Sequence, residues 1–254
     1  MVAAGQVAVS LLACGLLDTA SRSAARSAEQ ARDVSHPAVI SVASARVAGY
    51  IFLSLGELEI AERYANELID HAAIRGLHPL YAIGFCVRGS VAVKRADPAA
   101  GVDLLRRGLT DMRGTSYQLY YPFFLAELAA GLGALGRVEE SLVEIDAALG
   151  FAAQTGNRWF VPEALRIKGH LLARRDPGDA AIEACFVEGA AMARAQGALF
   201  WELRNAVALA RLRAAQERGG DARDILLPVY GRFVEGFDTP DLCAARAFLD
   251  ELRG

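Results

Sequence analysis

The sequence predicts an all-α fold, a right-handed α-solenoid of about six stacked helical hairpins with a C-terminal capping helix. Three observations support this prediction. Residues that end helices recur about every 40 positions. The apolar residues between them follow helical spacing, and no segment shows the sustained alternation of a half-buried strand. A solenoid fits because one hairpin cannot bury its own apolar faces, whereas stacked hairpins can.

The helix-ending residues form two interleaved series. The first comprises Gly15, Gly56, Asp97, Gly136 and Asp176, and the second comprises Gly76, Gly114, Gly156 and Gly197. Two series with one period predict two helices in each repeat. Glycine suits these positions because it adopts the left-handed conformation after a helix at little cost.

These boundaries predict a single domain, residues 1–254, because no long linker interrupts them. The predicted helix pairs cover residues 2–35, 36–76, 77–114, 115–156, 157–197 and 198–237, and a capping helix covers 239–252. Pro79, Pro122 and Pro162 fall early in the first helix of their pairs, and Pro98 and Pro177 open second helices. Proline is tolerated there because the first helical turn does not need its N–H.

Small residues after the first series predict how the paired helices pack. Ala20, Ala61, Ser141 and Ala181 each stand five positions after a stop. A small side chain there lets the second helix approach the first, as in hairpins of the tetratricopeptide (TPR) type. The period exceeds the usual 34 residues or so, which indicates TPR-like repeats with long helices. Leu142 belongs to an apolar stripe with helical spacing and is predicted to lie in the core.

Composition excludes several classes of protein. The net charge of −3 lacks the basic surplus of a nucleic-acid-binding protein. No apolar run reaches the roughly 18 residues of a membrane span. The apolar stretch 7–17 follows no Lys or Arg, so it differs from an export signal. The four cysteines are widely scattered, as expected of reduced thiols in a cytoplasmic protein.

No convincing catalytic motif is present, so the sequence predicts neither an enzyme nor a bound cofactor or metal. Gly131, Gly133 and Gly136 match a G-x-G-x-x-G pattern, but helical spacing precedes them instead of a strand. His36, His71, His78 and His170 do not form a metal-binding pattern. The carboxylates follow the expected solvent-facing sides of helices.

Aromatic and charged residues on the first helices form the candidate binding site. Tyr121, Trp159 and Trp201 are candidate apolar anchors, and Arg88, Arg166 and Arg204 are candidate partners of carboxylates, with Glu127 nearby. First helices line the inner wall of such a solenoid, so the sequence predicts a protein or peptide partner in the concave groove. Two alternatives stay open. The aromatic residues pack between repeats as core, or the groove holds a small-molecule ligand.

Several segments resemble one bacterial family. They are Leu165–Leu172 (LRIKGHLL), Ala193–Arg204 (ARAQGALFWELR), Leu209–Leu212 (LARL), Leu226–Phe233 (LLPVYGRF) and Glu235–Leu242 (EGFDTPDL). They are similar to the C-terminal TPR region of bacterial winged-helix/ATPase transcriptional regulators and related adenylate/guanylate cyclase-ATPase proteins.

This resemblance implies a regulatory module within bacterial signalling or transcription control. A signalling ATPase or a transcription regulator is the implied kind of partner. The 254 residues contain no winged-helix, cyclase or P-loop segment, so direct DNA binding and ATP hydrolysis are not implied. The chain then corresponds to the regulatory end alone, as a stand-alone module, as the small-molecule sensor of a signalling ATPase, or as a fragment of a larger regulator.

Overall fold

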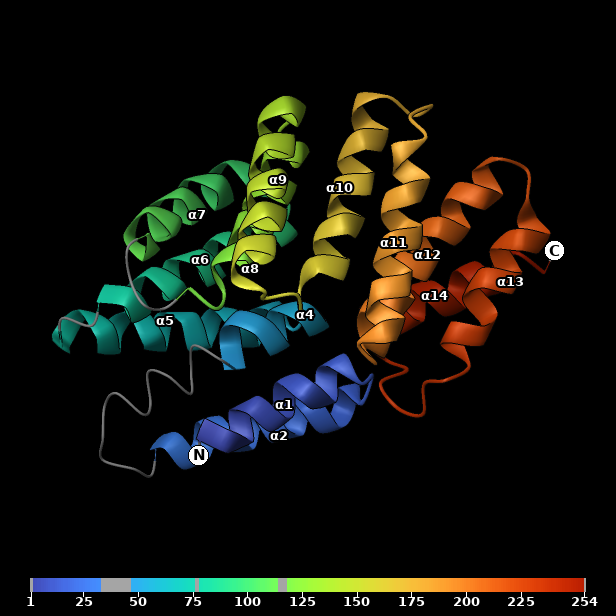
Figure 1. The fold of residues 1–254 in the computed structure, drawn as a ribbon. Helices are drawn as coiled ribbons and strands as arrows, with labels where there is room; N and C mark the ends of the chain where they lie inside the picture. The colour runs from blue at the N-terminus through green and yellow to red at the C-terminus, as the bar shows by residue number, and fades with distance from the viewer. Residues whose placement is uncertain (1, 33–46, 76–77, 114–117, 254) are drawn as a thin grey trace.

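The computed structural model describes residues 2–32, 47–75, 78–113 and 118–253, and every regular element in these ranges is helical (Figure 1). The prediction of an all-α fold is confirmed. The elements are α1 (Val2–Ala13), α2 (Leu17–Arg32), the π-helix η1 (Val47–Phe52), α4 (Leu53–Leu55), α5 (Leu58–Arg75), α6 (His78–Lys94), α7 (Pro98–Met112), α8 (Tyr121–Ala134), α9 (Val138–Thr155), α10 (Val161–Arg175), α11 (Ala181–Ala195), α12 (Leu199–Ala215), α13 (Gly219–Tyr230) and α14 (Pro240–Glu251).

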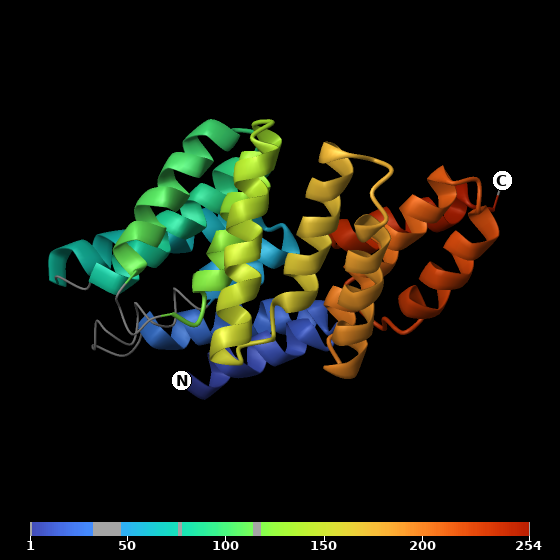
Figure 2. The ribbon, with the colours of Figure 1, turned by 45° about the horizontal axis from the view of Figure 1, so that its top comes forward.

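The helices form a solenoid of antiparallel hairpins, seen from two directions in Figures 1 and 2. The pairs are α1 with α2, η1–α4 with α5, α6 with α7, α8 with α9, α10 with α11, and α12 with α13. The final helix, α14, packs against α13.

Left-handed residues end the helices at the predicted period. Gly15, Gly56, Gly136, Gly156 and Gly197 all have φ between +67° and +84°. Ala96 has this conformation immediately before Asp97, whose side chain accepts a hydrogen bond from the backbone N–H of Ala100. The predicted stops Gly76 and Gly114, like His36, lie outside the described residues.

The small residues lie where the paired helices meet, with one exception. Ala20, Ala61 and Ser141 are fully buried, and the Ser141 hydroxyl donates to the carbonyl oxygen of Ala129. Ala181 is exposed, and Ile182 is buried in its place.

A longer turn explains this exception. Asp179 accepts a hydrogen bond from the N–H of Ala181 at 2.9 Å, so α11 begins only at that residue. Pro177 therefore lies in the turn. The prediction that Pro177 opens a second helix was wrong. In contrast, Pro79, Pro122 and Pro162 are each the second residue of a first helix.

The curved row of hairpins closes on itself, so that its first and last members touch. The backbone N–H of Thr19 donates to Oε1 of Glu235 at 2.8 Å, and its hydroxyl donates to Oε2 at 2.9 Å. The N–H of Gly236 donates to Asp18 at 3.0 Å. Figure 1 shows α1 and α2 extending below the other hairpins toward α12. We call these contacts the N–C clasp.

A segment of the chain itself fills much of the interior. In the continuous stretch of residues 49–55, every side chain is buried. Tyr50 contacts rings from the starts of α8, α10 and α12. The inner side of the solenoid is therefore divided, and two separate cavities remain beside this central segment.

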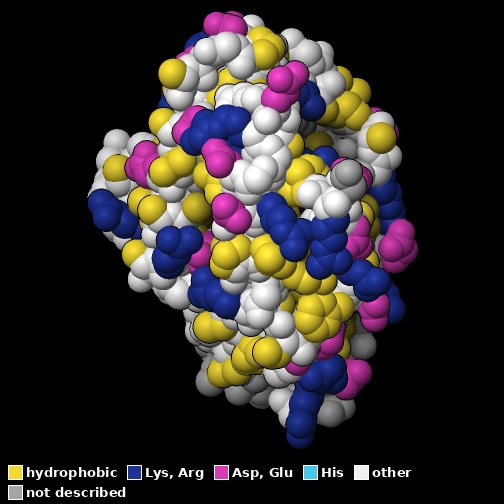
Figure 3. Space-filling model, turned by 90° about the vertical axis from the view of Figure 1, so that its right-hand side faces the viewer, with side chains coloured by type: hydrophobic (Ala, Val, Ile, Leu, Met, Phe, Trp, Pro, Cys, Tyr) yellow, Lys and Arg dark blue, Asp and Glu magenta, His cyan; other side chains and the backbone are white. Residues whose placement is uncertain are grey.

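Charged side chains are distributed evenly over the face that Figure 3 presents. Basic and acidic groups are interspersed there with apolar ones. Among the described residues, no helix is both long and apolar enough to cross a lipid bilayer.

Candidate functional site

The first cavity, which we call the aromatic cavity, has a volume of about 440 Å³. Its walls come from α1, η1, α12 and the turns that precede α8, α10 and α12. They comprise Gln6, Val9, Ser10, Ala13, Tyr50, Leu119, Tyr120, Trp159, Gln196, Ala198 and Trp201. Because three successive hairpins contribute, only the stacked fold assembles this cavity.

The aromatic rings of this cavity pack edge to face. The centroids of Tyr50 and Trp159 are 4.9 Å apart with an interplanar angle of 86°, and Tyr120 approaches Trp159 at 6.1 Å. This geometry is favourable for aromatic pairs and fixes the ring positions. Burial raises the pKa of the Tyr50 hydroxyl well above its usual value, so the ring stays neutral.

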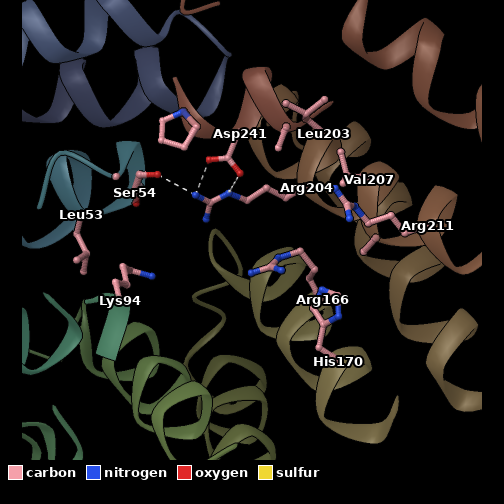
Figure 4. A pocket seen from close by; sticks show the side chains of 14 residues that line it. Leu53, Ser54, Lys94, Arg166, His170, Leu203, Arg204, Val207, Arg211 and Asp241 are labelled. Carbon is pink, nitrogen blue, oxygen red and sulfur yellow. Dashed lines mark hydrogen bonds and ion pairs between the residues drawn. The ribbon is translucent and has the colours of Figure 1, made fainter. Parts of the chain in front are cut away.

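The second cavity, which we call the basic cavity, also measures about 440 Å³. It lies between α4, α6, α10, α12 and α14, and its charged lining residues are Lys94, Arg166, Arg204, Arg211 and Asp241. Figure 4 shows Lys94 and Arg166 pointing into the same space from opposite walls.

Arg204 on α12 joins three elements around this cavity. It makes two hydrogen bonds to Asp241 at 2.8 and 2.9 Å and one to the carbonyl oxygen of Ser54 at 2.8 Å (Figure 4). It also donates to Glu163 at 3.0 Å. Its guanidinium carbon also lies 5.2 Å from the ring centroid of Trp201. Arg204 thus links the basic cavity to the aromatic cavity through one side-chain contact.

Glu163 is a buried carboxylate that remains charged. Burial alone opposes ionisation, but the positive charges of Arg166 and Arg204 outweigh it and lower the pKa of Glu163 to about 2. Arg166 holds it with two hydrogen bonds of 2.8 Å, from Nε and Nη2. The bonds from Arg166 lie within α10, and the bond that Arg204 donates to Glu163 at 3.0 Å joins α12 to α10 at the wall of the cavity.

The remaining cationic groups are less fully neutralised. Lys94 lies 3.3 Å from Glu127 and keeps about a third of its side chain exposed. Arg211 rests over the Phe248 ring at 4.9 Å and has no ion pair within the described part of the chain. His170 remains accessible, yet partial desolvation and the charge of Arg166 lower its pKa to about 4, so it is neutral at pH 7.

Four of the seven candidate residues line the two cavities, and a fifth pairs with a lining residue. Trp159 and Trp201 line the aromatic cavity, Arg166 and Arg204 line the basic cavity, and Glu127 pairs with Lys94 at its edge. The other two lie elsewhere. Tyr121 is buried against Phe151 and accepts a hydrogen bond from Arg113, and Arg88 is half-buried on α6. Phe124, Phe160 and Phe200, which stand near these residues in the first helices, are buried core.

Sequence reasoning missed Tyr50, Lys94 and Arg211. A signal for Tyr50 existed, because the run from Tyr50 to Leu55 lacks any charged residue and so has no solvent-facing side. Lys94 and Arg211 gave no signal, since both look like ordinary surface residues at helical spacing. Only the stacking of α6 and α12 around one space distinguishes them.

Among the residues that the structure describes, no three His, Cys, Asp or Glu side chains lie close enough together to hold a metal ion. Both described buried cysteines are poor nucleophiles. Burial raises the pKa of Cys86 strongly and that of Cys185 as well.

Comparison with known proteins supports the fold. No protein-family model matches the chain, and no curated protein matches it significantly. Among solved structures, a Rap protein complexed with competence and sporulation factor is similar, with a TM-score of 0.66. The match has 13% sequence identity and covers 97% of this chain and 72% of the Rap chain. This similarity supports a TPR-type helical solenoid.

Proposed function

We propose that the protein is a non-enzymatic TPR-like module that binds a peptide or protein partner through the aromatic cavity. The observation that carries this proposal is the cavity itself, a mainly apolar space lined by the half-buried rings of Tyr120 and Trp159 and backed by the buried rings of Tyr50 and Trp201. Large aromatic side chains in a partly enclosed site are typical anchors for an apolar side chain of a partner. Gln6, Ser10 and Gln196 add polar groups at its walls.

The comparison supports the same function. The similar Rap protein was solved in complex with competence and sporulation factor, so a solenoid of this shape is compatible with bound partners. The family resemblance in the C-terminal half favours a bacterial signalling or transcription-control system, with a signalling ATPase or a transcription regulator as partner. A cytoplasmic location fits this role.

A displayed library of random peptides tests the proposal on the full chain. We expect selected peptides to be rich in large apolar residues. Their binding should also change the fluorescence of Trp159 and Trp201, the only two tryptophans in the sequence, since both line the aromatic cavity.

Two substitutions on α1 serve as a test variant and its matched control. Ala13→Phe places a ring inside the cavity and should weaken peptide binding at least about tenfold, whereas Val7→Phe adds the same ring to an exposed position outside it. Trp159→Leu provides a second variant that removes one wall. The proposal is wrong if no peptide is selected, or if selected peptides bind Ala13→Phe and Trp159→Leu as tightly as the unmodified chain.

A further inference from the structure

The basic cavity has more cationic groups than its carboxylates neutralise. Four cations, Lys94, Arg166, Arg204 and Arg211, lie around it. Three carboxylates pair with them, namely Glu127, Glu163 and Asp241. His170 adds no charge at neutral pH. The cavity therefore retains an excess of one positive charge in a partly enclosed space, where charge is less screened than on an open surface.

The cationic groups around the basic cavity also have hydrogen-bond donors that no protein group uses among the described residues. Arg211 is held only by its contact with Phe248 among the described residues, so its guanidinium donors are unused. Arg166 uses Nε and Nη2 for Glu163, which leaves Nη1 without a protein partner in the described ranges. The ammonium group of Lys94 points into the cavity opposite Arg166 (Figure 4).

Asp241 and Glu163 do not compete for these donors, and Glu127 accepts one hydrogen bond from Lys94 at 3.3 Å. Both Asp241 oxygens accept from Arg204, and both Glu163 oxygens accept from Arg166. The carboxylates thus fix the positions of two arginines and leave the other donors directed at the cavity. Guanidinium and ammonium groups arranged in this way match the oxygens of a phosphate or a carboxylate.

We propose that the basic cavity binds a small molecule through an oxyanion group, with Lys94, Arg166 and Arg211 as its contacts. The volume of about 440 Å³ lies within the range of small-ligand sites. This site is distinct from the aromatic cavity and does not depend on peptide binding there. The shared chemistry is that of an oxyanion, and the experiment distinguishes phosphate from carboxylate.

Calorimetric titration of the full chain tests the proposal with two sets of probes at matched ionic strength. Inorganic phosphate and ribose 5-phosphate form the phosphate set, and citrate and N-acetylglutamate form the carboxylate set. We expect saturable binding in at least one set, weakened about tenfold or more by Arg211→Gln. Arg246→Gln removes the same charge from an exposed position on α14 and should leave affinity unchanged.

A pair of substitutions at Ala244 gives an independent test, because this exposed residue of α14 lines the cavity. Ala244→Glu supplies an internal carboxylate and should abolish binding, whereas Ala244→Gln has the same size without the charge and should retain it. The proposal is overturned if neither set binds beyond an ionic-strength effect. It is also overturned if Arg211→Gln and Arg246→Gln weaken binding equally, or if the two Ala244 variants behave alike.

Discussion

Arg204 and Ser54 are 150 positions apart in the chain, yet Nη2 of Arg204 donates to the carbonyl oxygen of Ser54 at 2.8 Å. The bond joins α4, near the beginning of the solenoid, to α12, near its end. The same guanidinium also binds Glu163 and Asp241, so one side chain on α12 connects α4, α10 and α14.

Arg204→Ala should therefore destabilise the fold by about 3–5 kcal/mol, because it leaves Asp241 without its arginine and takes one of two arginines from the buried Glu163. Denaturant unfolding measures this loss. Arg204→Lys should recover only part of it, since an ammonium group cannot form the paired bonds to Asp241. A loss in Arg204→Ala no larger than that in the exposed Arg246→Ala would contradict the role assigned to Arg204.

Glu235 should hold the first hairpin in place. Glu235→Ala removes both bonds to Thr19 in the N–C clasp, so amide hydrogen exchange in residues 2–32 should accelerate while α8 and α9 remain protected. Glu251→Ala, at an exposed position near the C-terminus, serves as the control. Unchanged exchange in α1 and α2 would show that apolar contacts alone hold the hairpin.

Leu142 is buried in α9, as the apolar spacing predicts. Leu142→Ala should cost about 2–5 kcal/mol through lost burial and the cavity left behind. Its neighbour Val143 is 67% exposed, so Val143→Ala should change stability by less than about 0.5 kcal/mol. Equal effects of the two substitutions in denaturant unfolding would contradict the assigned orientation of α9.

Two glycines should respond in opposite directions to a methyl group. A Cβ at Gly101 would lie 2.7 Å from the carbonyl oxygen of Gly89, where α6 and α7 approach closely, so Gly101→Ala should destabilise by about 1–3 kcal/mol. A Cβ at Gly150 would meet nothing within 4 Å, and Gly150→Ala should stabilise α9 by about 0.5–1 kcal/mol. Thermal unfolding of both variants checks the signs, and a stable Gly101→Ala would refute the close approach.

His170 should make the protein less stable in mild acid. Its pKa is 6.5 in the unfolded reference and about 4 in the fold, so between these values the unfolded chain binds more protons. Stability attributable to His170 is therefore complete above about pH 6.5 and is lost as the pH falls toward 4. His170→Gln should remove this part of the dependence. Parallel stability curves for the two proteins between these pH values would contradict it.

Local signals in the sequence predicted the helical fold because each repeat carries its own boundaries. Gly56 and Gly136 adopt the left-handed conformation that ends a helix, and Ala61 and Ser141 lie at the buried contacts that follow. Such features depend on neighbouring residues, so spacing alone indicates them. Ala181 is the exception because the turn before α11 is longer than the others, and the spacing of helix-ending residues does not indicate turn length.

The candidate site was only partly predictable, since it depends on contacts between distant residues. Trp159 and Trp201 recur at the starts of first helices and line the aromatic cavity, whereas Phe160 and Phe200, whose rings contact theirs, do not line it. Periodicity cannot separate adjacent aromatic residues of one cluster, and Trp201 is itself 1% exposed. Nor does any local pattern indicate that Asp18 meets Gly236, which are 218 positions apart.

The N–C clasp also constrains how many hairpins can lie between its two sides, Thr19 and Glu235. In an open array, duplication of a single unit merely lengthens the row, because each unit contacts only its neighbours. Here an additional unit would displace Glu235 from Thr19 and Arg204 from Ser54, and both ends would lose their partners. The contacts therefore set the number of hairpins that can lie between Thr19 and Glu235.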